Sequence, residues 1–230
     1  MAEAARGSLS LFVTGTDTGV GKTLASTALI HALARHHVRV VGMKPVAAGT
    51  VRANGEEVNE DVVALRAASA CRVPPELDNP VLLPDPVSPH IAAARAGMPI
   101  DIAHLVACQR RLAQLAEAVV VEGAGGFLVP LSGSETGADL AQALGLPVVL
   151  VVGLRLGCLN HALLTAEAIR ARELTLAGWI ANHVDASMLA QEDNIAFLRH
   201  RLQAPLLATI QHQAAPDPRA IHFELPLAWQ

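Results

Sequence analysis

The sequence predicts an α/β fold, in which a doubly wound and mostly parallel sheet carries helices on both of its faces. Short apolar runs alternate regularly with helix-length segments rich in Ala and Leu, and this alternation is typical of parallel sheets that are buried on both sides. A glycine-punctuated turn joins the first apolar run to the first of these segments. Polar side chains follow several runs, at the sheet edge where such folds bind ligands.

Length and charge narrow the class of protein. A chain of 230 residues can form one large α/β domain, and we expect residues 1–230 to form a single domain. Only 17% of the residues are charged, the formal net charge is −4, and basic residues cluster no further than pairs such as Arg110 and Arg111. Aromatic residues are few and Tyr is absent. We therefore expect no nucleic-acid partner.

The chain carries no pattern typical of export or of membrane insertion. Residues 1–11 lack a long apolar run before a cleavage site, and apolar stretches such as 146–154 have only the length of a strand. Scattered cysteines in odd number favour reduced thiols; they are Cys71, Cys108 and Cys158. We expect a cytoplasmic protein that does not bind membranes.

The turn after the first apolar run has the features of a phosphate-binding loop. The run ends at Gly15, the turn reads Thr-Asp-Thr-Gly-Val-Gly, and Lys22 and Thr23 then open a helix. Backbone N–H groups in such a turn can hold a β-phosphate, the lysine can reach the β and γ oxygens, and the threonine can bind Mg²⁺. This context predicts a P-loop NTPase-like fold.

One departure and one alternative concern this loop. The strict pattern requires glycine at position 16, where this chain has Thr16, and the nearest glycine is Gly15. In the alternative interpretation, the turn only joins a strand to a helix, with Lys22 in solvent and Thr23 capping the helix. The Gly-Lys-Thr triplet at the helix start favours phosphate binding.

The remaining pattern predicts helices between buried strands. Helices are expected at residues 24–36, 61–70, 102–116, about 136–144, 160–172 and 188–202, and Pro89 and His90 are expected to open a short one. Strands are expected at residues 38–43, 118–121, 148–152, 176–181 and 206–210.

Two segments are expected to lack regular structure. Residues 47–59 are polar and contain glycine, which predicts a loop, and Asn59 is placed to cap the helix that follows. Residues 77–89 contain several prolines and are expected to be extended or irregular.

Polar groups at strand ends predict one shared site. Lys44, Glu122 and Asn182 follow or close three buried strands, and the phosphate-binding loop follows a fourth. Such ends meet at one edge of a parallel sheet. A second cation beside Lys22 suits a reaction with several anionic oxygens; in the alternative interpretation Lys44 is a surface lysine.

Carboxylates near this edge are candidate ligands for Mg²⁺. Glu122 corresponds in place to the second-strand carboxylate of nucleotide-hydrolysing enzymes, although it could instead cap a helix or order its loop. Asp61 lies near a helix start, where a negative charge is favourable without any metal. The pattern alone makes Asp61 structural, and it predicts that histidines such as His90 and His161 are not catalytic.

Seven blocks of sequence occur in order between Thr14 and Asn182. They read Thr14-Gly-Thr-Asp-Thr-Gly-Val-Gly-Lys-Thr23, Lys44-Pro-Val-Ala-Ala-Gly49, Asn59-Glu-Asp61, Ser88-Pro-His90, Val121-Glu-Gly-Ala-Gly-Gly126, Leu156-Gly-Cys-Leu-Asn-His-Ala-Leu-Leu-Thr165 and Gly178-Trp-Ile-Ala-Asn182. Together they closely resemble the dethiobiotin synthetase family. Many NTPases share the first block, whereas its combination with the second, fifth and sixth blocks is much more specific.

The resemblance implies an ATP- and Mg²⁺-dependent cyclo-ligase of biotin biosynthesis. The family closes the cyclic urea of dethiobiotin from 7,8-diaminononanoate, CO₂ and ATP, and releases ADP and phosphate. One amine takes up CO₂ as a carbamate, a carbamate oxygen attacks the γ-phosphorus, and the second amine attacks the resulting carbamic-phosphoric anhydride. No protein nucleophile is required, which agrees with a site that acts by positioning and electrostatic stabilisation.

The resemblance also implies roles for residues by position. Lys22 and Lys44 would stabilise the carbamate and the transferring phosphoryl group, and Asn182 would read the adenine edge. Mg²⁺ ligands are implied at Thr23, Asp61 and Glu122, and substrate contacts at Thr18, Lys44, Ala48 and Asn160. ATP contacts are implied at Gly19, Val20, Gly21, Lys22, Thr23, Leu24, Asp61, Glu122, Gly123, Ala124, Gly125, Asn182, His183, Gln211, His212 and Gln213.

The family forms homodimers, and residues 156–161 with 123–126 are implied to contact a partner subunit's substrate. Two departures from the family pattern concern binding. The family often has serine at position 48, and Ala48 lacks that side-chain hydrogen bond, worth about 1 kcal/mol. The family also tends to have proline where this chain has the Gln211 to Gln213 segment, so base selectivity stays open.

Two other functions also stay open. An amidoligase acting on a cobyrinic acid usually carries a glutamine-hydrolysing domain, for which this chain leaves no room. A switch ATPase of the MinD type resembles this chain in its phosphate loop but has lysine at the place of Thr16. Its membrane-binding members add an amphipathic C-terminal helix, whereas Pro216, Pro218 and Pro226 interrupt this tail.

Overall fold

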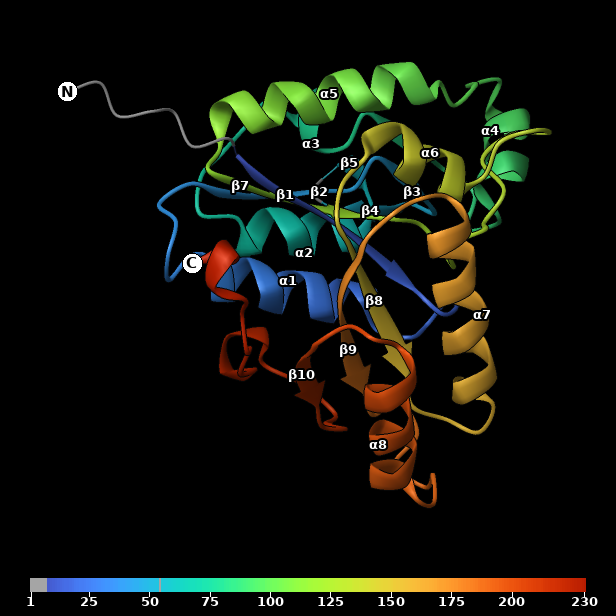
Figure 1. Ribbon diagram of the computed structural model, residues 1–230. Coiled ribbons are helices and arrows are strands. Elements are labelled where there is room, and N and C mark those ends of the chain that lie inside the picture. Colours follow the sequence, from blue (N-terminus) through green and yellow to red (C-terminus); the bar gives the residue numbers. More distant parts are fainter. Residues whose placement is uncertain (1–7, 54) are drawn as a thin grey trace.

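A six-stranded parallel sheet forms the centre of the molecule. The computed structural model describes residues 8–53 and 55–230, so the expectation on export signals falls mostly on residues outside it. The strand order is β10-β9-β8-β1-β7-β2 (Figure 1), and all neighbouring pairs are parallel. The strands are β1 (Leu9–Gly15), β2 (Val40–Met43), β7 (Ala118–Glu122), β8 (Val148–Gly153), β9 (Leu176–Asn182) and β10 (Leu206–Ile210).

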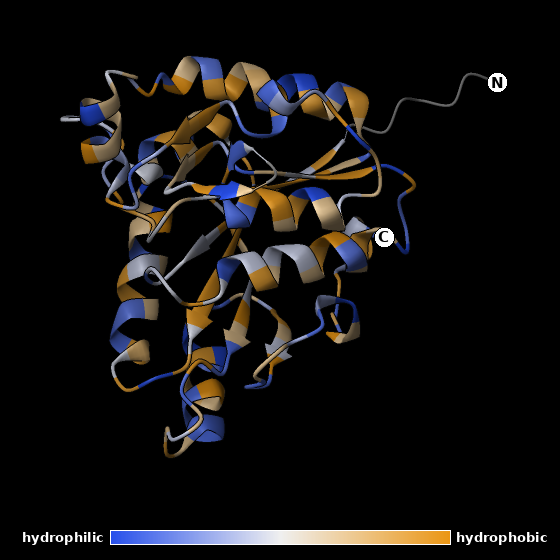
Figure 2. Ribbon diagram, turned by 180° about the vertical axis from the view of Figure 1, so that it is seen from behind, coloured by the Kyte–Doolittle hydropathy of each residue, from blue (hydrophilic) through white to orange (hydrophobic). Residues whose placement is uncertain are grey.

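Both faces of this sheet are buried. Along β1, Leu11 and Val13 pack into the core on one face, and Phe12 packs into the core on the other. Successive side chains of a strand point to opposite faces, so a sheet buried on both sides needs apolar residues at every position. Figure 2 shows the central strands as hydrophobic ribbons between helices of mixed character. The continuous apolar runs therefore predicted these strands correctly.

Helices cover the sheet on both sides, which confirms the doubly wound α/β class (Figure 1). One face carries α5 (Ile102–Leu115), α6 (Gly137–Leu144), α7 (Cys158–Ala171) and α8 (Gln191–Arg201). The other carries α1 (Lys22–Leu33), α2 (Glu60–Ala68) and the C-terminal segment with η1 (Pro218–Ala220) and η2 (Leu227–Trp229). Within the described ranges, no helix has both the length and the apolar character needed to cross a membrane.

The expected helices are present, with one notable shift. α8 begins at Gln191 rather than at residue 188. The side chain of Asp185 accepts hydrogen bonds from the backbone N–H and the hydroxyl of Ser187, and this local turn competes with helix. Asn59 caps α2 as predicted, because its side chain accepts from the backbone N–H groups of Asp61 and Val62 at 3.1 and 3.3 Å.

The prediction of a loop at residues 47–59 was wrong, whereas residues 77–89 are mostly extended or irregular, as predicted. The first segment contains a hairpin of β4 (Val51–Ala53) and β5 (Glu56–Val58), and β3 (Val46–Ala48) pairs in parallel with β6 (Val81–Leu83). The short helices α3 (Pro75–Asp78) and α4 (Pro89–Ala96) flank β6, and α4 starts at Pro89 as expected. These strands have three residues each, too few for an apolar period to stand out.

The sheet register brings the chemistry-bearing strand ends to one edge. Val13 of β1 lies opposite Glu122 of β7, and Gly153 of β8 lies opposite Asn182 of β9. β2 and β7 lie on one side of β1 in the sheet, and β8, β9 and β10, which come later in the chain, lie on the other side. Folds of this kind bind ligands at such a reversal, outside the carboxyl ends of the strands.

Candidate functional site

The phosphate-binding loop connects β1 to α1 and is supported from beneath by β9. Gly21 is the residue before α1 and has a φ of 82°, a conformation that favours glycine. A Cβ atom there would also lie only 2.1 Å from the Nδ2 atom of Asn182. That Nδ2 donates a hydrogen bond of 2.9 Å to the carbonyl of Val20. Asn182 therefore holds the loop backbone, a contact that sequence reasoning did not foresee.

Lys22 is folded back over the loop. Its side chain is buried, with 7% of the residue exposed, and its Nζ donates to the carbonyl of Asp17 at 3.0 Å. The carboxylate of Asp17 accepts from the N–H of Thr18 at 2.7 Å and from Arg155 at 2.5 Å. The alternative of a solvent-exposed Lys22 was thus wrong. Arg155, which precedes α7, joins this loop although sequence reasoning gave it no role.

Thr23 points its hydroxyl at two carboxylates. Its Oγ1 lies 2.6 Å from Oδ1 of Asp61 and 3.0 Å from Oε1 of Glu122. No side-chain cap is present at the start of α1, where Gly21 occupies the capping position, so the alternative role of Thr23 as a helix cap was also wrong. Three oxygen-bearing side chains from α1, α2 and β7 therefore meet beside the loop.

Lys44 completes this cluster from the end of β2. Its Nζ lies 2.7 Å from Oδ2 of Asp61 and 2.6 Å from Oε1 of Glu122. Only 4% of Lys44 is exposed and Glu122 is wholly buried, which excludes the surface-lysine interpretation. Neither carboxylate acts only as a local cap, because each pairs with a cation from another element. We call these four side chains the acid–lysine cluster: Thr23, Lys44, Asp61 and Glu122.

The charges of this cluster set its pKa values. Burial alone would lower the pKa of Lys44, but attraction to Glu122 and Asp61 outweighs it and raises that pKa. Burial likewise opposes ionisation of Asp61, yet the charge and hydrogen bond of Lys44 lower its pKa. For Lys22, burial and the nearby Lys44 charge lower the pKa to about 8. The two lysines of the site therefore differ, because the pKa of Lys44 is raised and that of Lys22 is lowered.

These two residues are the only lysines in the chain, whose 17 basic residues are otherwise arginines. A lysine ammonium is a compact point charge on a flexible stem, whereas a guanidinium is a broad planar fork. The compact ammonium of Lys44 contacts both Asp61 and Glu122 at once. Both lysines of the chain therefore lie at this site.

The acid–lysine cluster fits a magnesium ion. Thr23, Asp61 and Glu122 supply a hydroxyl and two carboxylates, and oxygen ligands with added water suit Mg²⁺. The Oε2 atom of Glu122 is buried without a protein partner, and a cavity of about 10 Å³ lies against this residue, room for about one water molecule. Outside this mixed set, the described part of the chain gathers no three His, Cys, Asp or Glu side chains as metal ligands.

The glycine-rich segment after β7 lies against the phosphate loop. A Cβ atom on Gly126 would be 3.7 Å from the Cα of Asp17, and Gly123 lies close to the Phe12 ring. A Cβ atom on Gly125 would lie 3.6 Å from Oγ1 of Thr18, so Gly125 and Gly126 adjoin the phosphate loop. Contact with ATP stays a prediction for residues 123–125.

The residues predicted to enclose the base are placed less tightly. His183 is buried, its Nδ1 lies 2.6 Å from Oε1 of Gln191, and its Nε2 has no protein partner. Nδ1 of His212 lies 3.2 Å from the His183 carbonyl, whereas Gln211 and Gln213 are exposed. These residues adjoin Asn182, and contact with a base stays a prediction for all of them.

The predicted substrate residues occupy separate elements around the loop. Thr18 is exposed in the phosphate loop itself, and Ala48 ends β3. The side chain of Asn59 donates to the carbonyl of Gly49 at 2.8 Å, which ties this strand to the start of α2. Asn160 lies in the first turn of α7. The roles of these residues in substrate binding stay predictions.

Solved structures with a similar fold include nucleotide-binding proteins. The signal recognition particle receptor FtsY from Elizabethkingia anophelis, in complex with GDP, matches with a TM-score of 0.55 and 17% identity over 96% of this chain. Chloroplast FtsY from Physcomitrella patens matches with a TM-score of 0.55 and 16% identity over 97%. This chain spans only 62% and 63% of those two chains.

The MinC:MinD cell division protein complex of Aquifex aeolicus gives a TM-score of 0.54 and 17% identity, over 90% of this chain and 83% of that one. These likenesses show a shared P-loop NTPase fold. A family model described as an AAA domain matches residues 10–219, and with the fold it supports a nucleotide-binding, ATPase-like function. The chain therefore belongs to the AAA domain family AAA_26, which includes dethiobiotin synthetase.

Proposed function

We propose that this protein is a dethiobiotin synthase, which uses ATP and CO₂ to close the ureido ring on 7,8-diaminononanoate. The observation that carries the proposal is the convergence of the two lysines of the chain on the phosphate end of the site. Lys22 lies over the phosphate loop, and Lys44 lies between Asp61 and Glu122. The sequence blocks around these residues resemble those of dethiobiotin synthetase.

In the proposed reaction, the site acts mainly by stabilising negative charge. In the proposed reaction one amine of the substrate adds CO₂ and loses a proton to give a carbamate. A carbamate oxygen then attacks the γ-phosphorus, and ADP leaves. Phosphoryl transfer needs positioned cations more than a protein nucleophile, and Lys22 and Lys44 supply two of them. The second amine finally attacks the anhydride carbon, loses its proton and expels phosphate.

The chain's own residues orient the nucleotide. Backbone N–H groups from Gly19 to Leu24 surround the place of the phosphates, as is usual where a loop enters a helix. Asn182 already uses its Nδ2 on the loop, which leaves its oxygen as the group for the amino edge of adenine. Bound at Thr23, Asp61 and Glu122, Mg²⁺ would neutralise phosphate charge.

We also propose a cytoplasmic homodimer of single-domain subunits, with the substrate near the subunit interface. Apolar side chains are exposed on the surface just after the glycine-rich segment, just before α7 and in the middle of α7. Leu156 is 95% exposed, and Leu128 and Leu164 are more than half exposed. Singly such residues are ordinary, but a cluster beside a binding site is typical of an interface.

The test is ATP turnover by the purified protein with Mg²⁺ and bicarbonate, with and without 7,8-diaminononanoate. We expect phosphate release to depend on the diamine and to match the appearance of a product with the mass of dethiobiotin. Slow release that is indifferent to the diamine would contradict the proposal. That result would favour a switch ATPase or an enzyme with another substrate.

A further inference from the structure

A second concave site lies next to the end of α2, away from the phosphate loop in the sequence. A pocket of about 380 Å³ is formed by the end of α2, the segment that follows it and α3. Its volume lies within the range of small-molecule sites. None of its residues belongs to the acid–lysine cluster or to the phosphate loop. They are Arg66, Ala67, Ser69, Cys71, Arg72, Val73, Pro75 and Asp78.

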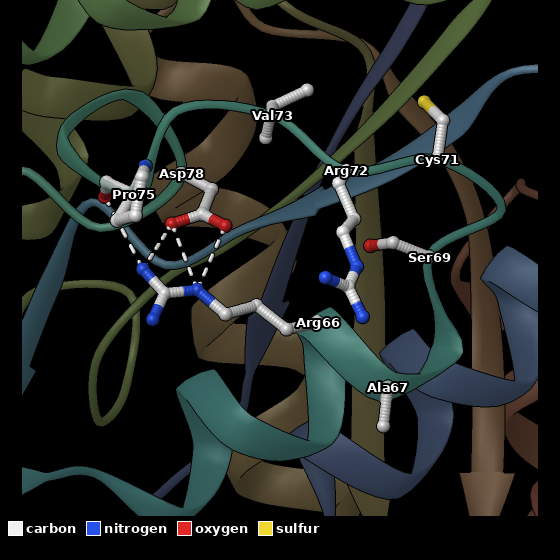
Figure 3. A pocket seen from close by; sticks show the side chains of 8 residues that line it. All are labelled: Arg66, Ala67, Ser69, Cys71, Arg72, Val73, Pro75 and Asp78. Atoms are coloured by element: carbon white, nitrogen blue, oxygen red, sulfur yellow. Dashed lines mark hydrogen bonds and ion pairs between the residues drawn. The ribbon is translucent and has the colours of Figure 1, made fainter.

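The one carboxylate in this pocket is already neutralised. Asp78 is buried, and the Nε and Nη2 atoms of Arg66 donate to it at 2.5 to 3.1 Å. Nη2 also donates to the carbonyl of Pro75 at 3.2 Å. Figure 3 shows this fork of dashed lines on one wall of the pocket. Arg66 therefore brings little net charge, but its outer nitrogen Nη1 stays available.

Arg72 is the uncompensated cation. Its side chain extends over the helix that carries Arg66 and Ala67, and no dashed line joins it to any residue drawn (Figure 3). Among the ion pairs of the described residues, none includes Arg72. The pocket thus combines a net positive charge with guanidinium nitrogens that lack protein acceptors.

These donors define a ligand class. Guanidinium groups bind carboxylate or phosphate oxygens, while Ala67, Val73 and Pro75 add apolar lining on different sides of the pocket (Figure 3). The hydroxyl of Ser69 is occupied, because it donates to the Leu65 carbonyl and accepts from the N–H of Gly42. The chemistry therefore selects a small organic anion over a cation or a neutral polar molecule.

The pocket is connected directly to Lys44. The backbone carbonyl of Asp78 accepts from the N–H of Lys44 at 2.7 Å, and the side chain of Asn79 donates to the Lys44 carbonyl at 2.7 Å. On the other side, the Lys44 ammonium pairs with Asp61, which lies on the same helix as Arg66. A ligand that competes with Asp78 for Arg66 would therefore act on both ends of the catalytic lysine.

We propose that this pocket binds a small organic anion through Arg72 and Arg66, and that its occupancy changes nucleotide binding through Lys44. This inference goes beyond the proposed reaction, because neither the binding of the anion nor its effect on nucleotide binding involves the diamine. A carboxylate and a phosphate ester share the required chemistry, and separate probes distinguish them.

The first experiment is calorimetric titration of glutarate and, separately, of glycerol 3-phosphate into the protein saturated with Mg·ADP. Filling the phosphate loop removes it as a competing anion site. We expect saturable binding of at least one probe, and Arg72→Ala should raise its Kd at least about tenfold. Arg199→Ala, on the remote α8, is the matched control and should leave the Kd unchanged. The site would be overturned if neither probe bound saturably. It would also be overturned if Arg72→Ala bound the probe as tightly as the wild type.

The second experiment measures the Kd of Mg·β,γ-methylene-ATP with and without a saturating amount of the bound probe. Coupling predicts a change of about fivefold, which Arg72→Ala abolishes. An unchanged nucleotide Kd, with the probe bound, would overturn the link to Lys44. Failure of either test would leave the diamine-dependent reaction unaffected, so the two proposals can fail separately.

Discussion

The two ends of the proposed nucleotide site are built in different ways. At the phosphate end, Lys44 and Glu122 are buried and bonded to each other and to side chains from α1 and α2. At the end predicted to hold the base, which we call the base end, Gln211 and Gln213 lie exposed after β10. Burying charge is costly unless every group is paired. The phosphate end is therefore part of the folded core, while the base end is a surface that a ligand must complete.

The largest effect is expected at Lys44. Lys44→Met should lower diamine-dependent turnover by at least about 1,000-fold, as for the loss of a key charge-stabilising group. It also leaves Glu122 buried without a cation, which should cost about 3–5 kcal/mol in the free energy of unfolding. Urea denaturation and product formation measure the two losses.

The double variant Lys44→Met/Glu122→Gln separates these effects. Removing both charges should restore much of the unfolding free energy, because no uncompensated charge stays buried, while turnover stays lost. Recovery of turnover together with stability would mean that Lys44 serves only the fold. That result would contradict the role of the phosphate end in the reaction.

The next effect concerns the metal. Thr23→Val keeps the side-chain shape but removes the hydroxyl that faces Asp61 and Glu122. We expect the Mg²⁺ concentration for half-maximal activity to rise about tenfold or more. Thr27→Val, one turn later on α1, is the control, since Thr27 bonds only to the carbonyls of Thr23 and Leu24. An equal rise in both variants would assign the effect to the helix rather than to the metal.

A pH effect should distinguish the two lysines. Lys22 has a pKa of about 8, so amine acylation of this residue should rise through that pH and be blocked by Mg·ADP. The raised pKa and burial of Lys44 should keep it unlabelled. Mass spectrometry can resolve both sites, because the chain has no other lysine. Labelling of Lys44 ahead of Lys22 would contradict the electrostatic account.

The lowered pKa of Lys22 also makes the free energy of unfolding depend on pH. The folded pKa of Lys22 lies below the value of 10.5 expected when the chain unfolds. The unfolded state then binds more protons between about pH 8 and 10.5, and this group makes the protein more stable as the pH rises through that window. Comparing the pH dependence of unfolding for wild type and Lys22→Met isolates this contribution.

The smallest effect is expected at the base end. Gln213→Ala should change the ratio of ATP to GTP affinity by less than about threefold and the free energy of unfolding by less than about 0.5 kcal/mol. The reason is that Gln213 is exposed and lies outside the core. Loss of folding or of all nucleotide binding in this variant would show that the base end is as tightly built as the phosphate end.

Features that depend on local sequence patterns could be predicted, whereas contacts between distant elements could not. Continuous apolar runs and helix-length segments revealed all six strands of the central sheet, and strand ends pointed to Lys44 and Glu122. Asp61 could not be assigned from its pattern, because a carboxylate at a helix start has a sufficient local reason. Its contact with Lys44 depends on how α2 packs beside β2, which no local period records.

Other features depend on tertiary contacts in the same way. The bond from Asn182 to Val20 and the pairing of Arg155 with Asp17 join residues more than 100 positions apart in the sequence. The pairing of β3 with β6 was missed because each strand is too short for a period and prolines flank β6. Long-range pairing, rather than local preference, forms these elements.

The most direct test of the central claim follows oxygen atoms through one turnover. Freshly dissolved C¹⁸O₂ is mixed with the protein, Mg·ATP and 7,8-diaminononanoate, and the reaction is quenched before the label exchanges with water. Attack by a carbamate oxygen on the γ-phosphorus predicts that one ¹⁸O appears in the released phosphate and one in the carbonyl of the dethiobiotin product. Unlabelled phosphate, or phosphate released without the diamine, would contradict the account.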